Sequence, residues 1–352
     1  RYLPEARRAG MRLRKGELSY YRRWARRVTW GAFGNDGSLN WDTGWGAHRR
    51  YLTQYWGWAA IELQAIADTS TILGPADRDR IRRMCGRIRS RYVAAADEVG
   101  LLPKTMYGAR THFADAGSDR ALASVRLARA VETCGPGARA VGPPTSAASF
   151  DRDQPRYAVT TSRYTTAVVG WSRDLAAGVL PVRLVDADGV AIGGLGGRRS
   201  SVDLQAGSLR LGHGHGKASR IRLSARAGSG PLAGRSVLRG TITRGRRKAT
   251  VRTRFTGSGF SITGRLDRKS PRRWRIPIGG KASLTVSRGS STKVTITPEV
   301  GAPWSVTVPG RARVGTAAVR ADPLDPTVRT ALVLNLPRGR TIGLRVRIGV
   351  AR

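Results

Sequence analysis

The sequence predicts an α+β protein of two domains, with helical hairpins over residues 1–145 and an all-β antiparallel sandwich over residues 146–352. The first observation is a change in apolar periodicity, from every three or four residues to every second residue. The second is a linker rich in Gly, Pro and Ser, GPGARAVGPPTSAAS, which lies where the period changes. The third is the length of 352 residues, which exceeds the usual size of one domain.

The helical prediction rests on segment 42–67, where apolar side chains recur at steps of three, four or seven residues. They are Trp45, Leu52, Trp56, Ala59, Leu63 and Ile66. Asp42 or Thr43 can cap the start of this helix by accepting backbone N–H bonds. Segments 74–100 and 117–134 repeat the pattern, and each ends at or just before a Gly. We therefore expect consecutive antiparallel helical hairpins in this domain.

The β prediction rests on seven segments in which apolar residues alternate with polar residues or Arg. They are 156–171, 219–226, 236–243, 248–255, 282–288, 293–300 and 341–350. Turns rich in Gly separate many of them at a spacing of about eight to twelve residues, which is typical of an antiparallel sandwich. Within 219–226 and within 341–350 the strand arginines share one parity, so we expect them on the outward face, with Ile, Leu and Val turned inward.

The formal net charge is +40, from 63 Lys or Arg and 23 Asp or Glu. Residues 1–150 carry 25 basic and 13 acidic side chains, and residues 151–352 carry 38 and 10, so most of the excess lies in the second part. A basic surface favours an anionic partner. Outward arginines are also typical of solvated sheets that resist association, and the sequence has no motif of a nucleic-acid-binding fold. Binding of a specific nucleic acid is therefore not expected, and nucleic-acid binding is the less favoured of the alternative functions.

The location of the protein is predicted from what the sequence contains and lacks. It has no run of eighteen apolar residues, so membrane insertion is not expected. Cys85 and Cys134 are its two cysteines, which suit one disulfide of an exported protein and fit two buried thiols equally well. We expect a bacterial protein that is secreted or bound to the cell envelope, with its export signal removed or with this chain a fragment of a longer protein.

Two of the four histidines, His213 and His215, lie in LGHGHGK. Their spacing can place both imidazoles on one side of a strand, toward a metal ion. The sequence offers no third ligand nearby, and the flanking glycines favour a surface hairpin. We expect no cofactor, although the sequence is compatible with a structural divalent cation.

Residues 35–58, NDGSLNWDTGWGAHRRYLTQYWGW, concentrate four tryptophans and two tyrosines. Trp45 and Trp56 belong to the apolar stripe of the predicted helix, which favours a place in the core. Tyr51 and Trp58 lie about 100° or more from the centre of that stripe, and Trp41 precedes the helix in a loop. These three rings are the ones we expect to be exposed. Exposed aromatic rings beside polar side chains suit carbohydrate, because flat rings stack on sugar faces.

Two motifs carry a resemblance to a known class of enzyme. DGSLNWDTGWG at Asp36–Gly46 is similar to a DGS-type loop followed by a Gly-aromatic-Gly helix start. FDRDQPRYAVTTSRYTTAVV at Phe150–Val169 resembles the opening strands of a sandwich that follow a Met/Phe-Asp-Arg segment. With the order of the two domains, they resemble the polysaccharide lyases of the heparinase II/III and chondroitin or hyaluronan lyase families. The resemblance implies that residues 1–145 are a partial α/α toroid, in the C-terminal portion or a shortened relative of such an enzyme.

The resemblance also implies β-elimination of an anionic, uronic-acid-containing polysaccharide. In this chemistry a neutralising side chain offsets the sugar carboxylate so that the C5 proton can be removed, and a Tyr or His takes that proton. Asn40 is then the neutralising residue, with Asn35 as its rival, and His48 is the base or the carboxylate partner. Tyr107 transfers protons, with Tyr51 and Tyr164 as competitors. The implied substrate-binding residues are Asn35, Asp36, Trp41, Asp42, Trp45, Arg49, Arg50, Tyr51, Tyr55, Arg110, His112 and Tyr164.

Other interpretations of the same residues stay open. Asn40 can cap a helix, His48 can lie at the edge of the core, and Tyr107 can be a packing residue. A glycoside hydrolase on a similar helical scaffold would use Asp36 and Asp42 as its acid and base. A non-catalytic protein that binds glycan or the cell envelope would use the β domain for binding, with the helical domain as a remnant.

Overall fold

The computed structural model describes residues 146–349 except 153–154, 171–177, 188–189, 195–202, 213–218, 226–229, 233–235 and 320–328. In the first part of the chain it describes residues 9–12, 14, 16–17, 19–20, 73–75, 78–79, 81–82, 86, 98, 125, 128–129 and 132.

Helical conformation in the first part occurs at 16–17 and 19–20, at 75, 78–79, 81–82 and 86, and at 125, 128–129 and 132. The second and third groups fall within the predicted helical segments 74–100 and 117–134. The Arg78 backbone N–H donates to the Gly74 carbonyl oxygen at 3.1 Å, a bond across one helical turn, and Ile81 is fully buried. The helical hairpins and the partial toroid concern residues outside those described, so they stay predictions, as does the division at residue 145.

The described residues of the second part form seventeen strands, and their pairings are antiparallel. The first nine are β1 (Ala147–Asp151), β2 (Arg156–Thr160), β3 (Tyr164–Val169), β4 (Pro181–Asp186), β5 (Ala191–Gly193), β6 (Asp203–Ala206), β7 (Leu209–Arg210), β8 (Ser219–Ala225) and β9 (Gly230–Pro231). The other eight are β10 (Ser236–Arg244), β11 (Arg247–Thr256), β12 (Gly259–Ile278), β13 (Ala282–Arg288), β14 (Ser291–Pro298), β15 (Trp304–Pro309), β16 (Arg313–Ala318) and β17 (Thr330–Ile348).

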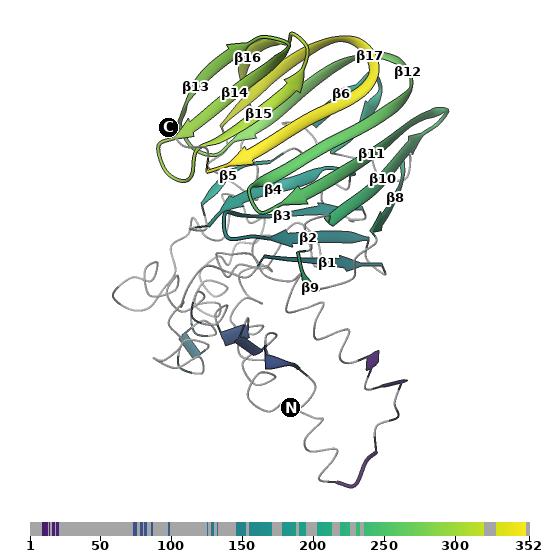
Figure 1. Cartoon of the computed structure of the whole chain (residues 1–352), viewed down its shortest axis with the longest axis vertical. Helices are drawn as coiled ribbons and strands as arrows, with labels where there is room; N and C mark the ends of the chain where they lie inside the picture. Colours follow the sequence, from purple (N-terminus) through teal and green to yellow (C-terminus); the bar gives the residue numbers. More distant parts are fainter. Residues whose placement is uncertain are drawn as a thin grey trace, which may run out of the picture.

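The strands form two layers that share the two longest strands, β12 and β17 (Figure 1). The first layer has the order β8–β10–β11–β12–β17–β15–β14–β13. The second layer runs from β16 through β17 and β12 to β6 and β5, and continues as β4–β3–β2–β1–β9. Because β12 and β17 pass from one layer to the other, the layers are joined along this side.

The passage between the layers is a bend in the β12–β17 pair. The register shifts between Arg265 and Ser270 and again between Ser270 and Arg272, and such irregularities bend a strand. Arg272 stabilises the bend, because its Nε and Nη2 donate to the Pro337 carbonyl oxygen at 2.9 and 2.7 Å. Its Nη1 donates to the Thr341 carbonyl oxygen at 2.6 Å. One guanidinium group thus holds the turn in β17, and its burial lowers the pKa of Arg272.

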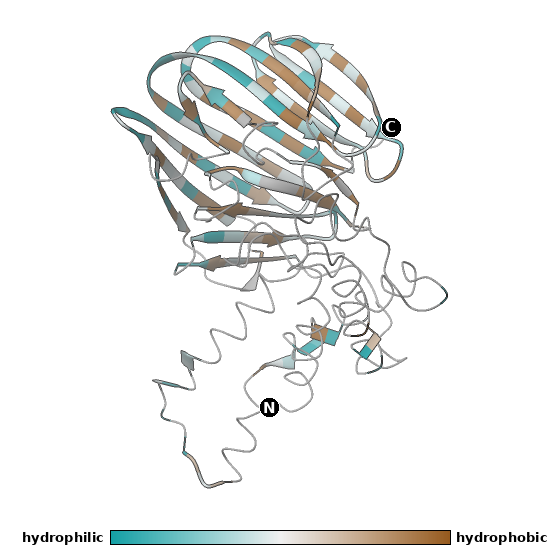
Figure 2. Cartoon of the chain, turned by 180° about the vertical axis from the view of Figure 1, so that it is seen from behind, coloured by the Kyte–Doolittle hydropathy of each residue, from teal (hydrophilic) through white to brown (hydrophobic). Residues whose placement is uncertain are grey.

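The apolar core lies between the two layers. Tyr157 on β2 stacks on Phe255 of β11, with ring centroids 5.4 Å apart, and Tyr164 on β3 packs against Phe260 of β12 at 6.3 Å. Trp274 is among the largest fully buried side chains. Apolar and polar residues alternate along the strands, as the brown and teal bands of Figure 2 show, because successive side chains point to opposite faces.

The structure confirms the strand predictions for the second part. All seven predicted segments contain strands, and Phe150–Val169 spans three antiparallel neighbours, the end of β1 with β2 and β3. Arg222, Arg345 and Arg347 are exposed, as their parity predicts. Among the described residues, none of the helical stretches has the length and apolar character needed to cross a bilayer.

Candidate functional site: an arginine-rich face of the sheet

Most of the residues that the sequence assigns to catalysis and binding lie outside the described residues. They are Asn35, Asp36, Asn40, Trp41, Asp42, Trp45, His48, Arg49, Arg50, Tyr51, Tyr55, Tyr107, Arg110 and His112. The same holds for Cys85, Cys134, His213 and His215. Within the described part of the chain, no group of three or more His, Cys, Asp or Glu side chains is placed to hold a metal ion.

Tyr164 is the predicted site residue that the structure describes, and its surroundings are those of a core residue. Its side chain is fully buried at the start of β3. Its hydroxyl lies 2.9 Å from the Thr256 carbonyl oxygen and 2.8 Å from the Gly259 carbonyl oxygen, and both oxygens can accept a hydrogen bond from it. Burial raises the pKa of the Tyr164 phenol well above its ordinary value, although the bond to Thr256 opposes this rise. Tyr164 thus ties β3 to the β11–β12 turn and does not present its hydroxyl to a substrate.

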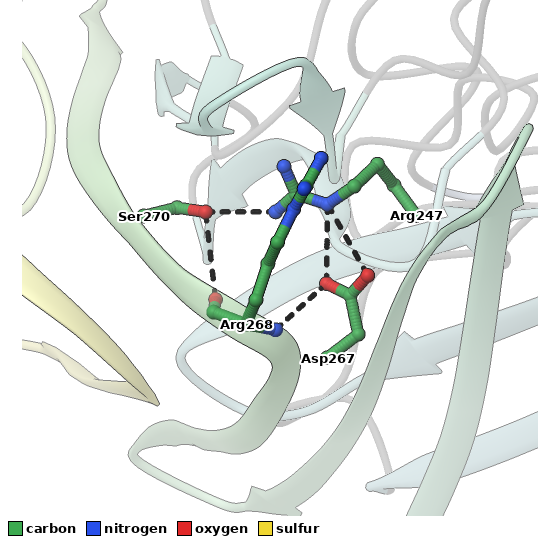
Figure 3. A network of polar contacts seen from close by, with 4 residues as sticks. All are labelled: Arg247, Asp267, Arg268 and Ser270. Carbon is green, nitrogen blue, oxygen red and sulfur yellow. Dashed lines mark hydrogen bonds and ion pairs between the residues drawn. The ribbon is translucent and has the colours of Figure 1, made fainter.

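A polar network lies at the corner where β12 leaves the first layer (Figure 3). Arg247 Nε donates to both carboxylate oxygens of Asp267 at 3.2 Å, and Arg247 Nη2 donates to Ser270 Oγ at 2.7 Å. The Arg268 backbone N–H also donates to Asp267 Oδ1 at 3.0 Å. Desolvation acts to raise the pKa of Asp267, but the hydrogen bonds and charge of Arg247, with backbone N–H bonds, hold it below its usual value. This network connects β11 with β12, and Arg247 and a backbone N–H hold its carboxylate.

The β part of the chain is basic to an unusual degree. From residue 204 to residue 320 the sequence has 25 Lys or Arg and two carboxylates, Asp267 and Glu299. Asp267 is paired with Arg247, and Glu299 lies beyond the end of β14. The basic side chains of this region therefore far outnumber the carboxylates that could neutralise them.

The excess charge gathers on the outer face of the first layer. The strand residues that form this layer, including 259–266 of β12 and 341–348 of β17, contain no Asp or Glu. The exposed arginines at their outward positions are Arg220, Arg222, Arg239, Arg252, Arg254, Arg265, Arg345 and Arg347. None of these forms an ion pair with a carboxylate of the described residues. Their neighbours in sequence are mostly apolar or Thr residues buried in the core, which fixes the direction in which the arginines point.

Two of these arginines oppose each other directly. Arg239 on β10 and Arg252 on β11 are register partners, so their side chains leave the same face of neighbouring strands. Like charges at such positions repel each other and destabilise the sheet. We therefore regard this face as the candidate functional site, a surface that can bind an anion. Its guanidinium groups have no carboxylate partner within the described part of the chain, and Thr and Ser hydroxyls lie between them.

The sequence predicted that arginines point outward but not that they form a continuous acid-free surface. The missed signal is the near absence of Asp and Glu after residue 203, which is visible in the sequence. The position of these arginines on one common face depends on which strands are neighbours in the sheet.

The chain is similar in structure to several polysaccharide lyases. A chondroitin AC lyase of Streptomyces coelicolor A3, solved with chondroitin sulphate, matches 93% of this chain and 45% of its own length, at 15% identity and a TM-score of 0.44. A heparinase III matches 95% of this chain and 55% of its own, at 10% identity and a TM-score of 0.44. The heparan sulfate lyase HepC of Pedobacter heparinus matches 86% and 60%, at 9% identity and a TM-score of 0.42.

This chain spans about half the length of those structures. No family model and no curated protein sequence matches the chain. Polysaccharide lyases are thus among the proteins that the chain resembles in structure. The identities and TM-scores are low, so the substrate of this chain has to be inferred from its own residues.

Proposed function

We propose that the protein acts on an anionic, uronic-acid-containing polysaccharide by β-elimination. The observation that carries the proposal is the arginine-rich outer face of the first layer, whose guanidinium groups lack carboxylate partners among the described residues. A linear polymer with carboxylates or sulfates offers the complementary charge, and Arg binds both groups by paired hydrogen bonds. The polymer lies outside the cell, so the protein is secreted or bound to the envelope.

The chemistry belongs to the aromatic-rich first part of the chain. Asn40 offsets the charge of the uronate carboxylate, and His48 or Tyr107 takes the proton from C5. The electron pair of that C–H bond forms the C4–C5 double bond, while the bond from C4 to the glycosidic oxygen breaks. That oxygen receives a proton from a tyrosine, for which Tyr107 is the candidate. Side chains supply every proton transfer, so no cofactor is needed.

The test is incubation of the full chain with hyaluronan, chondroitin sulfate, heparan sulfate, alginate and pectate, followed by the ultraviolet absorbance of the unsaturated uronate product. We expect a rise with at least one polymer, and its loss in Asn40→Ala/His48→Ala. Tyr164→Phe is the matched control: it should keep the activity, because Tyr164 is buried in the core.

Three other outcomes would contradict the proposal. Cleavage without an unsaturated product, abolished by Asp36→Ala or Asp42→Ala, would establish a glycoside hydrolase. Binding without cleavage of any polymer would establish a non-catalytic glycan-binding protein. Loss of the elimination product in Tyr164→Phe, with the fold intact, would mean that Tyr164, in the β part of the chain, takes part in the proton transfer.

A further inference from the structure

We infer that one cross-strand row on the outer face of the first layer, made of residues other than those proposed for cleavage, is a binding track for a polysaccharide in which uronate alternates with an uncharged sugar. The inference rests on the proposed function for the class of ligand. The row, called here the alternating row, consists of Arg254, Ser261, Arg345, Thr307, Lys293 and Ser287.

The register of the sheet places these six residues in one line across six strands. Arg254 on β11 is the partner of Ser261 on β12, and Ser261 is the partner of Arg345 on β17. Arg345 then pairs with Thr307 on β15. Lys293 on β14 pairs with Thr307, and Ser287 on β13 pairs with Lys293. Cations and hydroxyls therefore alternate from strand to strand along the whole row.

The six side chains share one face, because directly opposed residues of antiparallel strands point the same way. Arg254, Arg345 and Ser287 are exposed, and Ser261, Thr307 and Lys293 are partly exposed. The flanking residues Phe255, Val306 and Val346 are buried in the core, so the row cannot turn inward without exposing them. The three cations form no ion pair with a carboxylate of the described residues.

The spacing of the row determines which polymer fits it. Neighbouring strands lie about 4.8 Å apart, so the cations on alternate strands repeat at about 9.6 Å, and the three of them span about 19 Å. The repeat is comparable to the length of two linked sugar rings in an extended chain. A polymer with one carboxylate per disaccharide can thus place successive carboxylates at Arg254, Arg345 and Lys293. The hydroxyls of the uncharged sugars then lie over Ser261 and Thr307, which can donate and accept hydrogen bonds.

A nucleic acid fits the row less well. Duplex DNA carries one charge per about 1.7 Å of its axis, a far denser array than the row offers. Single strands are held by stacking on exposed aromatic rings. The aromatic side chains of these strands, Phe255, Phe260, Trp274 and Trp304, are all buried.

The test measures binding of hyaluronan oligosaccharides of four, six and eight sugars by calorimetry, using the full chain with Asn40→Ala/His48→Ala to prevent cleavage. Arg254→Gln/Arg345→Gln removes two cations of the alternating row. Arg220→Gln/Arg222→Gln is the control, because it removes the same charge from β8, an exposed strand of the same face. We expect the first pair to weaken binding about tenfold and the control to weaken it by about twofold or less. Affinity should rise from four to six sugars and then level off, because six sugars reach all three cations.

Equal losses in the two variants would overturn the inference, because they would show diffuse attraction to the whole basic face. Affinity that keeps rising with length beyond six sugars would do the same. Duplex DNA that displaces the oligosaccharide and shows the same dependence on Arg254 and Arg345 would establish a nucleic-acid surface instead. If Arg254→Gln/Arg345→Gln weakens binding more than the control does, but the native chain forms no elimination product, the proposed activity alone is contradicted. If the native chain forms the product but both variants lose the same affinity, the binding track alone is contradicted.

Discussion

Arg247 and Arg272 contact backbone or carboxylate groups at the corner of the sheet, whereas Arg254 and Arg345 project from its outer face. Arg272 donates to the carbonyl oxygens of Pro337 and Thr341, and Arg247 donates to Asp267 and Ser270. Both guanidinium groups are at least partly shielded from water, so their hydrogen bonds are stronger than those of exposed groups. The basic residues therefore separate into those that stabilise the fold and those that remain available to a ligand.

Asp267→Asn should destabilise the protein at neutral pH by about 1 kcal/mol, because it removes the negative charge that faces Arg247. The pKa of Asp267 is lowered in the folded protein. The carboxylate therefore stabilises the fold above its unfolded pKa, about 3.9, and this contribution is lost as the pH falls through the lower folded value. Urea unfolding at pH 7 and at pH 3 or below should show the difference between Asp267→Asn and the native chain shrink. Glu299→Gln, which changes an exposed carboxylate, should show little effect, and a difference for Asp267→Asn that is constant with pH would contradict the prediction.

At the level of elements, β12 determines how the two layers meet. Its residues 259–266 belong to the first layer and residues 270–278 to the second. The strand begins at Gly259, whose φ is +151°. A Cβ at this position would lie within van der Waals overlap of the Val346 carbonyl oxygen on β17. Glycine is thus required here both by the backbone conformation and by the close approach of the neighbouring strand.

Gly259→Ala should lower the free energy of unfolding by about 2 kcal/mol or more, because strain at a positive φ adds to the clash with β17. Gly257→Ala lies in the same β11–β12 turn and meets no atom within 4 Å, so it should change stability by a few tenths of a kcal/mol. Thermal or urea unfolding of the two variants measures the contrast. If Gly259→Ala and Gly257→Ala were equally stable, the start of β12 could move away from β17 at little cost, and the prediction would be wrong.

The continuous β12 strand could not be predicted from its sequence. Its middle, RLDRKSPRR, contains six charged residues and a proline, a composition typical of a loop. These residues are tolerated because the strand bends there and most of them are exposed at the corner. The first half of β17, TALVLNLP, begins without alternation because Ala331, Leu332, Val333 and Leu334 are all buried, so neither face of residues 331–334 is open to water.

For the molecule as a whole, the charge of +40 is divided unevenly between surface and core. The inner faces of the two layers are apolar, and the outer face of the first layer bears exposed arginines, with no Asp or Glu among the strand residues that form this layer, which include 259–266 of β12. Folding brings these like charges closer than they are in the unfolded chain, which opposes stability at low ionic strength. The same repulsion is relieved when an anionic polymer binds.

The melting temperature should therefore rise with NaCl, on the order of 3 °C between about 0.01 M and about 0.15 M, as the Debye length falls from about 30 Å to about 8 Å. Calorimetry or circular dichroism measures the shift. Arg239→Gln/Arg252→Gln removes a directly opposed pair of like charges and should show a smaller rise. A melting temperature that is flat or falls with salt would mean that the arginines are already neutralised within the protein.

The site residues of the first part, including Asn40, His48 and Tyr107, stay predictions from the sequence. Tyr164 lies in the second part and is the predicted site residue that the structure describes; its side chain is buried in the core. A tyrosine beside Arg163 in a polar turn sequence, TTSRY, is as consistent with an exposed phenol as with a buried one. Its hydroxyl is bonded to carbonyl groups at 256 and 259, more than ninety residues away, so only the folded chain could reveal its structural role.

The sequence by itself determined the antiparallel strands of the second part and the outward direction of their arginines, because a period of two places successive side chains on opposite faces. The tertiary structure decided which strands are neighbours and in what register. Arg254, Arg345 and Lys293 come into one row through four successive strand pairings, two of which join segments about forty and eighty residues apart. Such pairings depend on loop closure and on the packing of both layers around one core, and no local pattern of residues encodes either of them.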